Sequence, residues 1–131
     1  MQRLTSRAQF QSVMDGMTVA RTAHFVLHRK AVSQAMRESL FPGNPGVPEA
    51  DGAWLGALIP KRWAKRAVTR NAVRRQIYGV ASEFAARLGG GAHVVRLRSA
   101  FSRTEFPSAT STALKDAVRV ELRQLFAGYA A

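Results

Sequence analysis

The 131-residue sequence contains no cysteine, which excludes disulfide bonds, thiolate zinc sites and cysteine nucleophiles. It also contains no apolar run approaching the roughly 20 residues that a membrane-spanning helix needs. No long apolar stretch follows the basic residues near the N-terminus, so we expect neither a secretory signal peptide nor a membrane anchor. Together these absences favour a cytoplasmic protein that does not contact a membrane.

Acidic residues are scarce as well. Eight Asp and Glu residues stand against 20 Lys and Arg residues, which gives a formal net charge of +12 and a sequence pI near 11.7. So large a surplus of positive charge repels itself in the free protein and is typical of proteins that bind a polyanion. With 47% hydrophobic residues, the chain can bury one modest core. Composition therefore predicts a single nucleic-acid-binding domain over residues 1–131, with a basic protein of no specific partner as the alternative.

Hydrophobic periodicity predicts six elements in the order αββαβα. This order predicts a compact α+β domain, in which a small sheet carries helices on one face and leaves the other face partly open. Residues 33–53 hold three of the five prolines and three glycines, so we expect a flexible insertion loop there, with a helical turn near Met36. The expected helices lie between Thr5 or Ser6 and Asp15, at 68–88 and at 111–126, and the expected strands at 23–28, 54–59 and 93–97.

The segment from Gly52 to Ser82 contains no Asp or Glu. A solvated helix normally mixes charges of both signs to gain i,i+4 pairs, and Arg66 and Arg70 stand at a helix start, where the macrodipole disfavours cations. Phosphate would resolve this conflict, because a helix N-terminus with several arginines binds anions. A helix-turn-helix is disfavoured, since Pro60 and the strand before it leave no room for a first helix. The basic residues of the segment are Lys61, Arg62, Lys65, Arg66, Arg70, Arg74 and Arg75.

The basic pair at 61–62 and residues 66–75 (RAVTRNAVRR) resemble the signature helix of the bacterial ribonuclease P protein subunit. An Arg-Asn core with a basic pair at this spacing, after a strand and a short basic connector, is a fairly specific pattern. The resemblance extends over most of the chain outside residues 33–53 and the last few residues. Residues similar to the family's first helix and its three strands are 10–14, 25–28, 54–60 and 93–98.

The resemblance implies a subunit that joins a large catalytic RNA in removing the 5′ leader from precursor tRNA, with one protein per RNA. The RNA would supply the active site, together with magnesium held mainly by RNA, so this chain would carry no catalytic residue, cofactor or metal site. It also implies a left-handed β-α-β crossover around the signature helix. Catalytic-RNA binding is carried over to Lys61, Arg62, Lys65, Arg66, Arg70, Asn71, Arg74 and Arg75, and binding of the single-stranded leader to Phe10, Met14, Val26 and His28.

Five residues depart from the family's usual pattern. Ala72 and Tyr78 stand where basic residues are common, and Met14 and His28 stand where aromatic residues are frequent. Arg96 is charged where an apolar strand residue is usual, and on an open sheet face it would extend the basic surface toward the leader. Base stacking by aromatic side chains, the usual way of holding single-stranded RNA, would then rest on few residues.

Other function classes find less support in the sequence. His24 and His28 share a strand face, but four strand residues span roughly 13 Å, so the two cannot bind one metal ion. No pair of Asp or Glu lies near the basic segment, which disfavours a two-metal nuclease centre in the protein. A structural ribosomal RNA-binding protein of similar fold stays the alternative.

Overall fold

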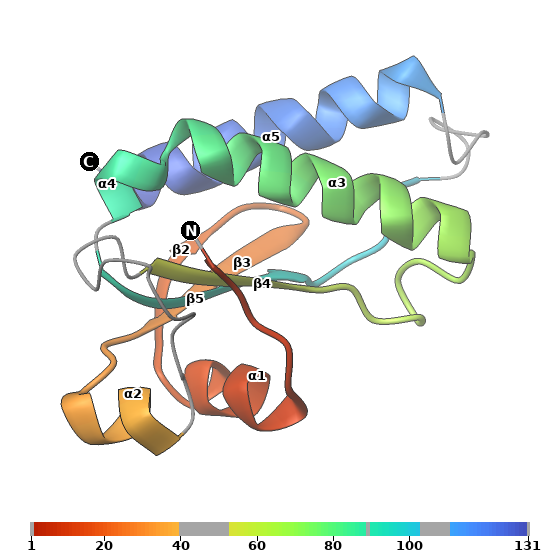
Figure 1. Ribbon diagram of the computed structural model, residues 1–131. Coiled ribbons are helices and arrows are strands. Elements are labelled where there is room, and N and C mark those ends of the chain that lie inside the picture. The colour runs from red at the N-terminus through yellow and green to blue at the C-terminus, as the bar shows by residue number, and fades with distance from the viewer. Residues whose placement is uncertain (1, 40–52, 89, 103–110, 131) are drawn as a thin grey trace.

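The computed structural model describes residues 2–39, 53–88, 90–102 and 111–130, which form a five-stranded sheet with helices on both faces (Figure 1). The strands are β1 (Gln2–Arg3), β2 (Met17–Arg21), β3 (Phe25–Lys30), β4 (Ala53–Leu58) and β5 (Gly91–Leu97). The helices are α1 (Arg7–Met14), α2 (Gln34–Ser39), α3 (Ala67–Glu83), α4 (Ala85–Leu88) and α5 (Thr112–Ala130).

The sheet has the strand order β1-β4-β5-β3-β2. β1, β4 and β5 run parallel, whereas β3 is antiparallel to β5 and β2 is antiparallel to β3. Because β4 and β5 are parallel neighbours joined through α3 and α4, they form a β-α-β crossover. The predicted α+β domain is confirmed.

The main core lies between the sheet and the two long helices, α3 and α5, which share one face (Figure 1). The prediction that helices lie on one face alone is wrong for α1, which buries its apolar side against the opposite face. Phe25 and Leu27 of β3 point into it and are fully buried, as are Ile77 of α3 and Phe126 of α5. A second, smaller cluster lies on the other face, where α1 packs against the sheet. Since alternate strand residues enter the two clusters, the sheet is buried on both faces where α1 covers it. The second cluster consists of Leu4, Val13, Trp54, Ala92 and Val94.

The two edge strands escaped the sequence analysis for a physical reason. β1 has two residues, which is too short to show an alternating pattern. β2 is partly or fully exposed along its length, and Met17 at its start is 72% exposed. Neither strand therefore carries the apolar alternation that marks a strand in a sequence.

The predicted helix at 68–88 is divided in two at Phe84. The backbone there leaves the helical region, with φ −106° and ψ 6°, and the Phe84 ring stacks on Phe126 with ring centroids 5.7 Å apart. Helix α2 lies at the helical turn expected near Met36. The remainder of the predicted loop, residues 40–52, lies outside the described residues.

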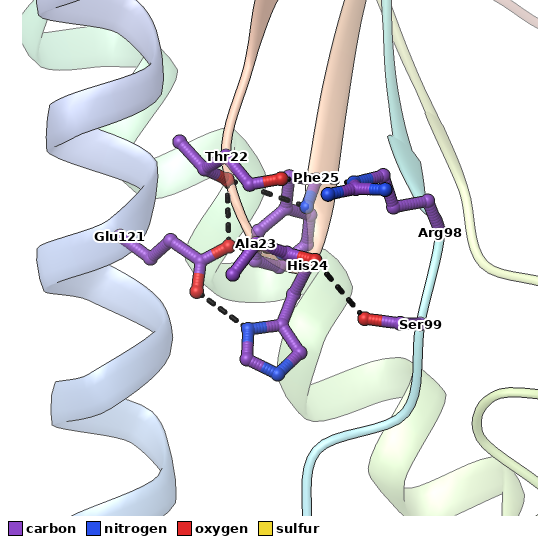
Figure 2. Close-up of polar contacts among 7 residues, drawn as sticks. All are labelled: Thr22, Ala23, His24, Phe25, Arg98, Ser99 and Glu121. Carbon is purple, nitrogen blue, oxygen red and sulfur yellow. Dashed lines mark hydrogen bonds and ion pairs between the residues drawn. The ribbon is translucent and has the colours of Figure 1, made fainter.

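The turn between β2 and β3 is tied to α5 by one carboxylate (Figure 2). Glu121 accepts hydrogen bonds from the Thr22 hydroxyl at 2.6 Å and the His24 main-chain N–H at 2.7 Å, and its other oxygen lies 2.7 Å from His24 Nδ1. Arg98 and Ser99, the two residues after β5, donate to main-chain carbonyls of the same turn. The turn is therefore held from two sides, which fixes the start of β3.

Candidate nucleic-acid interface

The basic connector between β4 and α3 is held in place by an arginine of α3. Arg70 Nη1 donates to the main-chain carbonyls of Ala64 at 2.9 Å and Lys65 at 2.8 Å. Arg66 is the N-cap residue of α3, and its side chain makes no capping hydrogen bond. The first turn of α3 contains no acidic residue. The start of α3 thus presents main-chain N–H groups and cations together, which is the environment that a phosphate group requires.

The remaining predicted RNA-binding residues lie along the connector and the first half of α3. Arg74 Nη1 donates to Asn71 Oδ1 at 2.8 Å, which fixes the two side chains side by side. Arg75, one residue further, is exposed. We call the α3 basic surface the set that the sequence predicted: Lys61, Arg62, Lys65, Arg66, Arg70, Asn71, Arg74 and Arg75. Every member is exposed or half-buried.

The two departures from the family pattern that lie on α3, Ala72 and Tyr78, have different environments. Ala72 is buried, with 8% of its surface exposed. Tyr78 is half-buried and packs against the main core, and the guanidinium carbon of Arg3 lies 4.0 Å from the centroid of its ring. A cation therefore does lie beside position 78, supplied by β1 instead of α3.

Helix α1 places two of the predicted leader-binding side chains on the opposite sheet face. Its start is fixed by a capping box, in which the Ser6 hydroxyl accepts from the Gln9 main-chain N–H and the Gln9 side chain accepts from Ser6. Phe10 and Met14 are half-buried against the second cluster. A Cβ atom on Gly56 of β4 would lie 2.5 Å from the Phe10 ring, so glycine leaves the room that this ring occupies.

Val26 and His28 of β3 lie on the same face but are more deeply buried. Val26 is 1% exposed and His28 is 6% exposed. In the sheet register, Val26 stands between Arg96 of β5 and Arg21 of β2. Since Arg21 is exposed and Arg96 half-buried, these arginines offer more surface to a ligand than the two predicted residues do. Arg21 was missed because β2 was not predicted. We call the α1 face the set Phe10, Met14, Val26, His28, Arg21 and Arg96.

The His28 ring is held in one neutral form. Arg96 Nε donates to His28 Nε2 at 3.3 Å, so that nitrogen is the acceptor and the ring proton lies on Nδ1, which is 3.4 Å from the Thr18 hydroxyl. Burial lowers the pKa of His28, and the positive charges of Arg96 and Arg21 lower it further. At neutral pH the positive charge on this face therefore comes from the arginines.

Comparison with known proteins identifies the family. The ribonuclease P protein component of Ralstonia pickettii is 37% identical over 124 residues, which cover 95% of this chain and 76% of that protein. That of Paraburkholderia xenovorans is 33% identical over 123 residues, which cover 94% and 76%. A sequence model described as Ribonuclease P matches residues 1–124. The chain belongs to the ribonuclease P protein family.

The fold is shared with a solved structure of the Staphylococcus aureus RNase P protein. The TM-score is 0.63 at 20% sequence identity, and the match covers 97% of this chain and 94% of that chain. Membership in the ribonuclease P protein family implies a role in the 5′ processing of tRNA and partnership with the ribonuclease P RNA. It also sets aside the ribosomal alternative.

Two further properties concern the described part of the chain. Within residues 2–39, 53–88, 90–102 and 111–130, no three His, Asp or Glu side chains gather in an arrangement that could hold a metal ion. Within the same ranges, no helix has the length and apolar character needed to cross a membrane.

Proposed function

We propose that this chain assists a catalytic RNA in removing the 5′ leader from precursor tRNA, with the α3 basic surface on the catalytic RNA and the α1 face on the leader. The observation that carries the proposal is the concentration of cations on α3 and its connector. The segment from Gly52 to Ser82 has no acidic residue to neutralise them. Several arginines beside an uncapped helix start favour the phosphates of a folded RNA.

Binding of the leader to the α1 face is supported by the chemistry of its side chains. Single-stranded RNA is held by cations that follow the backbone and by aromatic rings on which bases stack. Phe10 supplies a half-buried ring, and Arg21 and Arg96 supply two cations on the strands that flank β3. Contact through shape and charge would make this binding tolerant of the leader's sequence.

The reaction itself would belong to the RNA. Magnesium would be held mainly by RNA, and the arginines of this chain would neutralise nearby phosphates. Weaker repulsion between phosphate groups would let metal ions bind at the cleavage site at lower concentration. The protein would thus contribute affinity and electrostatic stabilisation, and no catalytic side chain.

Reconstitution tests this function directly. The purified chain alone should leave precursor tRNA intact, whereas the chain mixed with a bacterial ribonuclease P RNA should restore cleavage at a magnesium concentration too low for the RNA by itself. Cleavage is measured as release of the 5′ leader, and an unrelated basic protein of similar charge serves as the control. Absence of rescue would contradict the proposal, and cleavage by the chain alone would assign the active site to the protein.

The α3 basic surface can be tested through the dependence of binding on salt. Arg74→Ala and Arg75→Ala should each weaken binding to the ribonuclease P RNA and reduce the slope of log K against log salt by about one unit, because each removes one phosphate contact. Arg123→Ala is the matched control, since Arg123 lies on α5 and pairs with Glu83. A slope equal to that of the wild type would place the replaced arginine off the RNA.

A further inference from the structure

Arg3 and Tyr78 form a stacked pair at the edge of the sheet. The guanidinium carbon of Arg3 lies 4.0 Å from the centroid of the Tyr78 ring. Arg3 belongs to the two-residue strand β1, where it lies opposite Leu55 of β4, and its own surface is exposed. Tyr78 packs against the main core, so its ring is a fixed support for the guanidinium. The pair therefore holds an exposed cation in one place.

The position of the pair continues the α3 basic surface. Tyr78 follows Arg74 and Arg75 by one helical turn, so the three side chains occupy neighbouring positions on α3. The opposite flank of the helix faces α5, because Gln76 accepts a hydrogen bond from Arg119 there. The guanidinium above Tyr78 consequently extends the line of cations from α3 across to β1.

Among the residues that the structure describes, no carboxylate forms an ion pair with Arg3. Residues 1–14 contain no acidic residue, and neither do residues 52–82, which supply β4 and nearly all of α3. A guanidinium stacked on an aromatic ring uses its flat face for that contact and keeps its N–H groups at the edge. Those N–H groups suit two oxygens of one phosphate. Because the ring already orients the group, less conformational entropy is lost when a phosphate binds.

We propose that Arg3, oriented by Tyr78, is a further contact to a backbone phosphate of the catalytic RNA. This inference rests on the proposed function, since it extends the surface assigned to that RNA. Tyr78 acts here as a positioning residue, and Arg3 makes the contact. The α3 basic surface then includes one cation from the N-terminal segment, so RNA binding joins β1 to α3.

The test measures the affinity of the full-length chain for ribonuclease P RNA over a range of salt concentrations. Arg3→Gln should weaken binding roughly fivefold and reduce the slope of log K against log salt by about one unit. Tyr78→Leu keeps an apolar side chain but removes the ring, so it should weaken binding while leaving the slope near the wild-type value. Tyr78→Phe keeps the ring and should bind like the wild type. Thermal unfolding of each variant checks that the fold is retained.

Arg87→Gln is the matched control. Arg87 is exposed, and its guanidinium also lies over an aromatic ring, 5.8 Å from the centroid of Phe84, but beyond the end of α3. The same loss of charge there should leave the slope unchanged. Equal slopes for Arg3→Gln, Arg87→Gln and wild type would overturn the contact, and wild-type affinity for Tyr78→Leu would overturn the positioning role.

Two further outcomes separate the sources of the phosphate and the two proposals. If Arg3→Gln weakens binding of a single-stranded leader oligonucleotide and not of ribonuclease P RNA, the assignment to the catalytic RNA is overturned. If the wild-type chain fails to restore cleavage, both the proposed function and the contact of Arg3 with the catalytic RNA are contradicted. If the wild type restores cleavage but Arg3→Gln leaves the slope unchanged, only the contact of Arg3 is contradicted, and the proposed function stands.

Discussion

Replacing Glu121 with alanine is expected to lower the free energy of unfolding by about 2 to 4 kcal/mol, because hydrogen bonds to a charged group stabilise more than neutral ones. The carboxylate accepts from the Thr22 hydroxyl and the His24 main-chain N–H, and its other oxygen lies beside the His24 ring (Figure 2). Its side chain is only 14% exposed, so water replaces few of these contacts. Alanine would leave a main-chain donor and a hydroxyl at the turn without an acceptor.

Denaturant unfolding at pH 7.5 measures the free energy of unfolding, and two further variants serve as comparisons. Glu121→Gln keeps an oxygen that can accept hydrogen bonds and should be less destabilising than alanine. Glu83→Ala removes an ion pair with Arg123 in which both side chains are 48% exposed, and it should change stability little. Equal effects of Glu121→Ala and Glu83→Ala would show that the turn is not held by the carboxylate.

The same replacement should separate the two proposed RNA-binding surfaces. Glu121 fixes the turn that joins β2 to β3, and these strands carry Arg21, Val26 and His28 of the α1 face. The α3 basic surface has its own support in the contacts of Arg70 with the connector carbonyls. Affinity for a leader oligonucleotide should therefore fall more than affinity for the catalytic RNA. A larger fall for the catalytic RNA would contradict this division of the surfaces.

The sequence predicted those parts of the structure that depend on local patterns. Three of the five strands, β3, β4 and β5, contain short apolar runs, which are typical of strands buried on both faces. The basic connector and α3 lie in one continuous segment. Ser6 was recognised as a possible N-cap because a cap depends on residues three positions away. These features need only neighbouring residues, so the sequence alone is sufficient.

Contacts between residues far apart in the chain could not be predicted from local sequence patterns. Glu121 meets Thr22 and His24 across 99 and 97 positions, and Arg3 meets Tyr78 between the first strand and α3. No periodicity or motif joins residues that far apart, so only the fold brings them together. The burial of His28 escaped prediction for the same reason, since it depends on Arg96 of another strand.

His93 is expected to make the protein less stable as the pH falls below about 6.5. The side chain lies in β5 on the main-core side and is fully buried. Its Nδ1 lies 3.3 Å from the Trp54 carbonyl oxygen, so this nitrogen carries the proton, while Nε2 is buried without a hydrogen-bond partner. Burial lowers the pKa of His93 to about 4, and the charge of Arg29 adds to the shift, against opposing main-chain hydrogen bonds.

The sign follows from proton binding in the two states. The unfolded chain takes up a proton at His93 near pH 6.5, and the folded chain takes it up only near pH 4. Between these values the unfolded state binds more protons, so stability is fully present above pH 6.5 and declines as the pH falls. At one pKa unit per roughly 1.4 kcal/mol, this residue should remove about 2 kcal/mol between pH 7.5 and pH 4.5.

His93→Asn isolates this contribution, because asparagine does not titrate and keeps an N–H group that can donate to the Trp54 carbonyl. The variant should be less stable than the wild type at pH 7.5, since a smaller side chain leaves a cavity in the core. Its stability should nevertheless decline less than that of the wild type between pH 7.5 and pH 4.5. Denaturant unfolding at a series of pH values gives the two curves. Parallel curves would mean that His93 is protonated equally easily in the folded and unfolded chains, and the buried neutral ring would then have no part in acid sensitivity.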